Sequence, residues 1–174
     1  MRTSRLFVAA VVGMLSLSIA MPALADTTTA SVTVTGGTLT ISAPPDAGSL
    51  GSIANSVSGG TISGTLGEVQ VNDARSAAAG SGWVASVIST AFTPSSGPTI
   101  AASFVGYTAG TITKVGTATY TANDPANLTG VSAAVTATGI TGDNSATWTP
   151  TINVAVPGGT IATTYNATIT HSVV

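Results

Sequence analysis

The side chains that could carry out catalysis are few and scattered in this 174-residue chain. It has no cysteine and a single histidine, His171. In the last expected strand, His171 occupies one of the alternate positions that are otherwise apolar. A lone histidine cannot form a His-rich metal site, so we expect it in the core or at an edge, hydrogen-bonded to the backbone. No serine lies in the Gly-x-Ser-x-Gly pattern of an activated nucleophile. The sequence therefore predicts a non-enzymatic protein without a metal or cofactor.

Carboxylates offer another route to catalysis, because a pair of them can hydrolyse a glycosidic bond. Glu68, Asp73, Asp124 and Asp143 could meet in space, but such sites usually lie in an aromatic-lined cleft, and only 5% of this chain is aromatic. Asp124 and Asp143 also lie in Asn-Asp-Pro and Gly-Asp-Asn sequences, where a short carboxylate caps its own backbone. We therefore interpret them as turn residues.

Four residues are the candidates for ligand binding: Asp73, Arg75, Trp83 and Trp148. Asp73 and Arg75 lie two positions apart, so on an extended segment they point to the same side. We expect an ion pair that holds the loop before Trp83, although Arg75 could also bind carboxylates or phosphates. Each tryptophan is either a core residue, as is common in β-sandwiches, or an aromatic platform for a ligand.

The first 25 residues have the features of a secretory signal peptide. Arg2 and Arg5 precede an apolar run over residues 6–21, and Ala23-Leu24-Ala25 offers small residues to a signal peptidase. An uncleaved membrane anchor is the alternative interpretation. Cleavage would leave residues 26–174 as one domain, with no further membrane span.

Charge is scarce and slightly negative. Only 6% of the residues are charged, against about 25% in a typical soluble domain. Residues 26–174 contain two basic and six acidic side chains, a net charge of −4. Nucleic acid and anionic lipid are therefore not expected partners.

Threonine alternates with apolar residues along most of the chain, a pattern typical of β-strands. We expect a hairpin over residues 31–41 with its turn at Gly36-Gly37, then a long loop over 42–63 in which one short edge strand is the alternative. Breaks are expected at 72–75, 77–82 and 141–144. The remaining expected strands, in chain order, cover residues 66–71, 83–90, 100–104, 112–120 and 131–138.

The last forty residues carry the clearest alternation. Residues 148–156 and 165–173 each place apolar side chains at every second position, on either side of Pro157-Gly158-Gly159. This predicts a two-stranded ribbon with a buried face. The sequence as a whole predicts an all-β fold, an antiparallel β-sandwich of Ig-like or Greek-key-like type, with a barrel as the alternative.

Several motifs occur in a characteristic order: Asp73-Ala74-Arg75, Gly82-Trp83, Trp148-Thr149-Pro150, Val156-Pro157 and Tyr165-Asn166-Ala167-Thr168. In this order they resemble the WxL domain family over most of residues 26–174. The two Trp-x-Leu motifs that name the family are replaced here by Trp83-Val84-Ala85 and His171-Ser172-Val173.

The resemblance implies a protein exported by a Gram-positive bacterium and bound non-covalently to the cell wall, with peptidoglycan or an attached wall polymer as the ligand. It also implies a membrane-anchored partner protein on the cell surface. The alternative is a structural or adhesive surface subunit that assembles with a partner through exposed strand edges.

Overall fold

The computed structural model describes residues 27–174, so the predicted signal peptide lies outside the described residues. The described residues up to Val34 belong to one unit and Thr35–Val174 form a second. The elements of the second unit are β1 (Leu39–Ser42), β2 (Gly60–Thr65), β3 (Val69–Ser89), β4 (Thr93–Pro94), the 3-10 helix η1 (Ala102–Phe104), β5 (Val105–Thr108), β6 (Thr113–Ala122), β7 (Ser132–Trp148), β8 (Thr151–Val156), β9 (Tyr165–Asn166) and β10 (Ile169–Val173).

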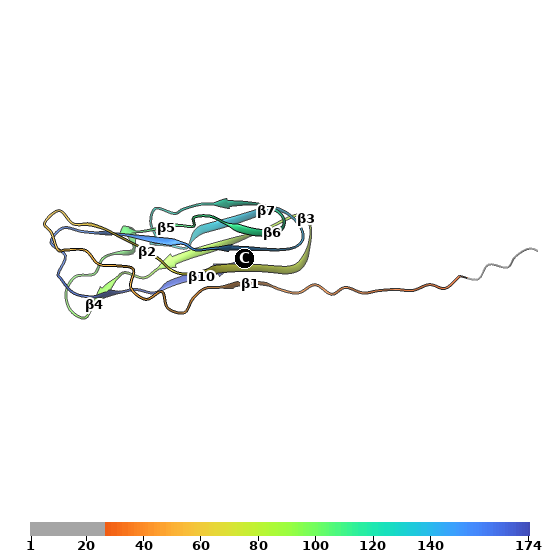
Figure 1. Cartoon of the computed structure of the whole chain (residues 1–174), viewed down its shortest axis with the longest axis horizontal. Helices are drawn as coiled ribbons and strands as arrows, with labels where there is room; N and C mark the ends of the chain where they lie inside the picture. Colours follow the sequence, from red (N-terminus) through yellow and green to blue (C-terminus); the bar gives the residue numbers. More distant parts are fainter. Residues whose placement is uncertain (1–26) are drawn as a thin grey trace, which may run out of the picture. The chain divides into compact units, whose positions relative to one another are not determined.

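The strands form antiparallel sheets, which confirms the predicted all-β class (Figure 1). The larger sheet has the order β1-β3-β7-β6, with β10 also paired to β3, and it curls until it is nearly closed like a barrel. The smaller sheet has the order β2-β8-β5, and β4 pairs with β9. No helix in the described part of the chain is long and apolar enough to cross a membrane.

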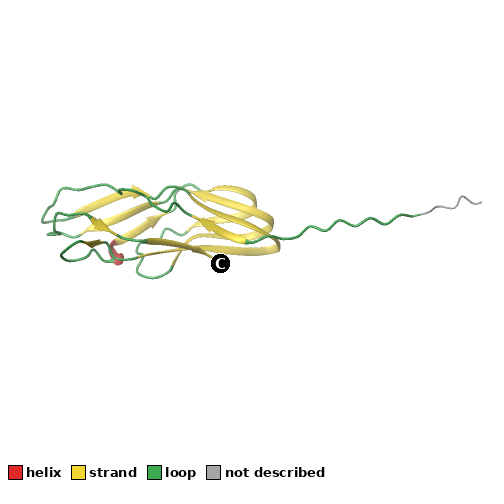
Figure 2. Cartoon of the chain, turned by 90° about the horizontal axis from the view of Figure 1, so that it is seen from below, coloured by secondary structure: helices red, strands yellow, loops and turns green. Residues whose placement is uncertain are grey.

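The strands β3 and β7 form a long ribbon that bends back on itself. Asp73 and Trp83 are ten residues apart in β3, about 33 Å if the strand were straight. Both nevertheless form a hydrogen bond with the side chain of Asn144, which lies opposite Asp73 in β7. β3 must therefore turn a corner between Asp73 and Trp83, and the bending of the long strands is visible in Figure 2.

Irregular pairing makes this corner. The β3–β7 register shifts repeatedly between Asp73 and Trp83, and the β6–β7 register shifts on both sides of Thr117. Bulges of this kind increase local bending and let a strand pass from one layer to the next. Gly116 has φ 88°, and a Cβ there would lie 2.6 Å from the Asp143 carbonyl oxygen, so the corner of β6 requires glycine.

Three of the predicted breaks between strands lie inside strands at this corner. Residues 72–75 and 77–82 lie within β3, and residues 141–144 lie within β7. The polar residues and glycines there resemble turn sequences, but two neighbouring strands bend together and keep their pairing. The prediction of loops at these positions is therefore wrong.

The predicted hairpin over residues 31–41 does not form. Leu39 and Ile41 lie in β1, which pairs with β3 instead, while residues 31–35 are in no strand. Pairing with β3 packs Leu39 and Ile41 against the core, whereas a hairpin on its own is marginally stable. The predicted strand over 100–104 is also wrong, because an isolated bridge at Ile100 is followed by η1.

The predicted alternation at the C-terminal end is confirmed, but the predicted pairing is wrong. Trp148, Pro150, Ile152 and Val154 are buried, and the residues that alternate with them are more exposed. However, β8 pairs with β2 and β5, whereas β10 pairs with β3, so the two strands belong to different sheets. The turn at residues 157–159 thus connects layers of the fold and not a two-stranded ribbon.

Candidate functional site

Asp73 and Arg75 form the ion pair that the sequence predicts. Arg75 Nε lies 2.8 Å from Asp73 Oδ1, and Nη2 lies 2.9 Å from Oδ2, so the contact is bidentate. Nη2 also donates a hydrogen bond of 3.2 Å to the carbonyl oxygen of Gly82, on the far side of the corner. The pair therefore holds the two arms of β3 together, as the sequence interpretation of a clamp before Trp83 requires.

The buried Asn144 extends this cluster into the core. Its Nδ2 donates to Asp73 Oδ2 at 3.2 Å, and its Oδ1 accepts a hydrogen bond from Trp83 Nε1 at 2.9 Å. The hydroxyl of Tyr120 lies 3.3 Å from the same Oδ1, and its ring packs against the Trp83 indole with the centroids 5.8 Å apart. We call these five residues, Asp73, Arg75, Trp83, Tyr120 and Asn144, the corner cluster.

Electrostatics within the corner cluster favour the ionised carboxylate. The Asp73 side chain is fully buried, but hydrogen bonds from the Arg75 guanidinium outweigh the desolvation and hold its pKa below the ordinary value of 3.8. Hydrogen bonds from the Arg75 backbone and from Asn144 act in the same direction. Asp73 is therefore a charged acceptor that organises its surroundings.

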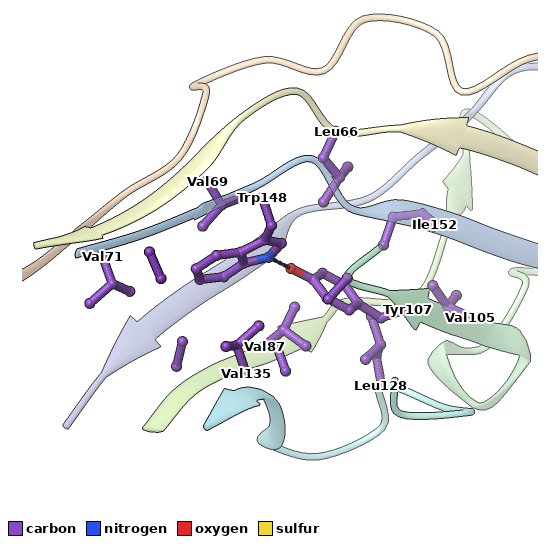
Figure 3. Close-up of a cluster of buried hydrophobic side chains, with 14 of the residues drawn as sticks. Leu66, Val69, Val71, Val87, Val105, Tyr107, Leu128, Val135, Trp148 and Ile152 are labelled. Carbon is purple, nitrogen blue, oxygen red and sulfur yellow. Dashed lines mark hydrogen bonds between the residues drawn. The ribbon is translucent and has the colours of Figure 1, made fainter. Parts of the chain in front are cut away.

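A second polar chain crosses the core at Trp148 (Figure 3). Trp148 Nε1 donates a hydrogen bond of 2.7 Å to the Tyr107 hydroxyl, which lies 3.2 Å from His171 Nε2. Burial raises the pKa of Tyr107 and lowers that of His171, so both groups are neutral near pH 7. His171 is thus a half-buried structural residue, although its partner is a side chain and not the backbone.

The burial of His171 predicts a pH dependence of stability. Because its pKa is lowered in the folded state, the unfolded chain binds a proton first as the pH falls through the ordinary value of 6.5. The free energy of unfolding should then decrease between about pH 7 and pH 5. Since the chain has one histidine, His171→Gln should remove this slope in urea unfolding curves measured at several pH values. An unchanged slope in the variant would contradict the assignment.

Neither tryptophan offers a ring to a ligand. Trp83 and Trp148 are each 2% exposed, and each indole nitrogen is bonded within the protein. Of the two sequence interpretations, burial supports the core residue for both. Arg75 remains 38% exposed, but it is committed to Asp73 and Gly82. The four candidate residues therefore lie in structural positions, three of them in the corner cluster and Trp148 in the second polar chain.

A surface suited to a polar ligand lies elsewhere, on the outer face of the β2-β8-β5 sheet. A shallow dish of about 380 Å³ is lined there by Thr61, Phe104, Thr108, Asp124 and Asn153, among others. Phe104 is 45% exposed, an unusual position for a large ring in this chain. Asp124 brings a carboxylate, and the other four of these side chains are uncharged.

Asn153 is at the centre of the hydrogen bonding on this face. Its Oδ1 accepts a hydrogen bond of 2.7 Å from Ser63 Oγ, and its Nδ2 lies 3.4 Å from Thr108 Oγ1. These bonds run across three neighbouring strands and fix the orientation of the amide. The dish thus offers an oriented amide and hydroxyls next to an exposed aromatic ring.

Sequence reasoning did not identify this dish. The alternation of residues 151–156 places Asn153 on the exposed face, but it does not show which strands lie beside it. The sequence predicts Phe104 in a strand with Ile100, whereas in the structure it ends η1 and lines the dish. Only the pairing of β8 with both β2 and β5 assembles the site.

A larger hollow of about 800 Å³ has a different character. It is bordered by residues 43–56 and 160–169, and its lining includes Ile62, Val156 and Ile161. Asp46 is the one Asp, Glu, Lys or Arg residue in this lining. Within the described residues there is no group of three His, Cys, Asp or Glu side chains that could hold a metal ion. Comparison with known proteins found no family model, curated protein or solved structure that matches the chain.

Proposed function

We propose that this protein is a secreted, non-catalytic surface protein that binds the Gram-positive cell wall without a covalent link. The proposed ligand is peptidoglycan or a polymer attached to it. The observation that carries the proposal is the dish on the β2-β8-β5 sheet, which is lined by both the exposed ring of Phe104 and the oriented amide of Asn153. The sequence resemblance to WxL domains supports the same function, and with it a membrane-anchored partner protein.

The chemistry of the dish suits amino sugars and short peptides. An aromatic ring makes apolar contacts with the C–H groups of a sugar ring, while amides and hydroxyls exchange hydrogen bonds with sugar hydroxyl and acetamido groups. The volume of the dish lies near the lower end of the range for small-ligand sites, about 300–1,000 Å³. One such contact is weak, so stable attachment depends on many contacts along an immobile polymer.

The charge of the protein favours one component of the wall. Two basic side chains, Arg75 and Lys114, stand against six acidic ones in residues 26–174. Long-range repulsion from anionic wall polymers is therefore expected, and it weakens with rising salt concentration. We accordingly propose the glycan and peptide of peptidoglycan, rather than the anionic polymers, as the part that is bound.

Removal of the exposed ring tests the proposal. Phe104→Ala should weaken binding to purified peptidoglycan about tenfold, since the lost apolar contact is worth about 1.4 kcal/mol. The measurement is a binding isotherm, obtained from the unbound protein left after the wall material is sedimented. Val115→Ala is the matched control, because Val115 is 66% exposed on β6 and does not line the dish. Equal binding by the two variants would exclude Phe104 from the site.

A further inference from the structure

Residues 30–35 have the sequence of a β-strand but no strand partner. Ala30, Val32 and Val34 alternate with Ser31, Thr33 and Thr35, so an extended segment has one apolar face and one hydroxyl face. In the structure this segment is in no strand, and Val32 and Val34 are 92% and 84% exposed. β1, which was expected to pair with it, pairs with β3. We call residues 30–35 the donor segment.

The edge of β2 offers the complementary feature. β2 is at the end of its sheet and pairs with β8 on one side. The hydrogen bond from Leu66 N to Pro150 O continues this ladder. The backbone N–H and C=O groups of the even-numbered residues of β2 therefore bond to β8, and those of the odd-numbered residues point away from β8, towards the free edge. Within the described residues, the backbone N–H and C=O groups of Thr61, Ser63 and Thr65 at this free edge have no protein partner.

The two strands match in length and in the alternation of their side chains. β2 has six residues in continuous register, as many as the donor segment. The inward-facing positions of β2 are Gly60, Ile62 and Gly64, and Ile62 lines the apolar hollow. The outward side chains of β2 are Thr61, Ser63 and Thr65, which are hydroxyl-bearing like those of the donor segment.

Residues 43–55, which border this hollow, make few hydrogen bonds. Within the described residues, the hydrogen bonds of residues 43–55 are local: Gly48 N to Asp46, and Gly51 N to Ser49. The backbone of Leu50 and the side chain of Ile53 lie over β2, close to where Cβ atoms on Gly64 and Gly60 would lie. A segment with few hydrogen bonds and mostly small side chains can shift at low cost to admit apolar side chains.

We infer that the donor segment of one molecule adds as a strand to the free edge of β2 in a second copy of this protein, with Val32 and Val34 against the apolar hollow. Neither residues 27–42 nor residues 59–67 contain a charged side chain, so no charge selects a different partner and none opposes self-pairing. Every copy carries both the donor and the edge. Strand addition of this kind takes affinity from the backbone and specificity from the side-chain pockets.

The contact is heterologous, because the two surfaces in it are different. Such contacts continue from copy to copy and form rings or open chains. The outward threonines of the donor segment would extend the hydroxyl face of the β2-β8-β5 sheet. The inference does not depend on the proposed wall binding, which uses the outer face of this sheet and not its edge.

Cross-linking can identify the strand edge to which the donor segment adds, because the natural chain has no cysteine and each variant introduces a single thiol. The protein is expressed with its own residues 1–25 and purified from the medium of a secreting host. A mixture of Thr33→Cys and Thr65→Cys proteins, treated with a short bis-maleimide, should give a mixed dimer as the dominant product. A mixture of Thr33→Cys with Thr119→Cys, on the free edge of β6, is the matched control. Preferential linkage to position 119 would overturn the assignment to β2.

Assembly measured by light scattering tests the apolar face. The unaltered protein should form species larger than a monomer as its concentration rises. The V32D/V34D variant should raise the dissociation constant at least about a hundredfold, because two apolar contacts are lost and two carboxylates would have to be buried in their place. S31D/T33D adds the same charge to the hydroxyl face and should have a smaller effect.

Two results would overturn the inference of a second copy. One is a protein that stays monomeric at its highest soluble concentration. The other is a T33C/T65C double variant that links within one molecule and never between two. Either result leaves sedimentation with peptidoglycan unaffected, so the failure of this inference is distinguishable from failure of the proposed function.

Discussion

Replacement of Trp83 by alanine is expected to lower the free energy of unfolding by about 3–5 kcal/mol. The indole is 2% exposed and lies inside the corner at which β3 folds back. Its loss opens a cavity beside Tyr120 and leaves Asn144 Oδ1 without its donor on the indole nitrogen. The measurement is equilibrium unfolding in urea, followed by far-UV circular dichroism.

Trp83→Phe separates packing from hydrogen bonding. Phenylalanine retains much of the buried ring but cannot donate to Asn144, so this variant should lose about 1–3 kcal/mol. Phe104→Ala is the control, because Phe104 is 45% exposed and its removal should change stability little. A Trp83→Ala protein as stable as the unaltered one would contradict the assignment of Trp83 to the core.

Replacement of Asp73 by asparagine should cost about 1.5–3 kcal/mol at neutral pH, the usual contribution of a hydrogen bond to a charged group. Asparagine has nearly the same shape, but one oxygen becomes an NH2 group that faces the donors of Arg75. The partial exposure of Arg75 favours the lower part of this range, since water can solvate the released guanidinium.

The cost should disappear in acid. Because the pKa of Asp73 is depressed in the folded state, its stabilisation is fully present above the ordinary value of 3.8. It is lost as the pH falls through that value towards the folded pKa. Unfolding curves for the unaltered protein and for Asp73→Asn should therefore converge at low pH. Asp143→Asn, which alters a hydrogen bond to Ser76 at the same corner, is the matched control. A pH-independent difference would contradict the charged role of Asp73.

Local patterns in the sequence predict the faces of the strands. Alternation correctly places Trp83, Ala85 and Val87 on one buried face, because side chains alternate across a strand whatever its partners are. The ion pair between Asp73 and Arg75 is likewise local, since two positions on one extended segment determine it. These features of the fold are determined by residues that are close together in the sequence.

Strand pairing depends on residues far apart in the sequence, and the sequence predictions fail at the features that this pairing determines. Gly142 and Asp143 look like a turn, but they lie at a corner where β3, β6 and β7 bend together while remaining paired. Asn144 has no distinctive sequence context, yet it joins Asp73 to Trp83 across 61 and 71 positions of the chain. The dish at Asn153 has the same origin, because its rim comes from strands far apart in sequence.

The central claim is that the dish on the outer face of the β2-β8-β5 sheet binds peptidoglycan itself. The most direct measurement compares co-sedimentation with Gram-positive walls before and after their anionic polymers are removed, with Phe104→Ala beside the unaltered protein. We predict that the stripped walls retain at least as much unaltered protein as the native walls, and that Phe104→Ala binds more weakly to both. Loss of binding on stripping, or pelleting of neither protein, would contradict the claim.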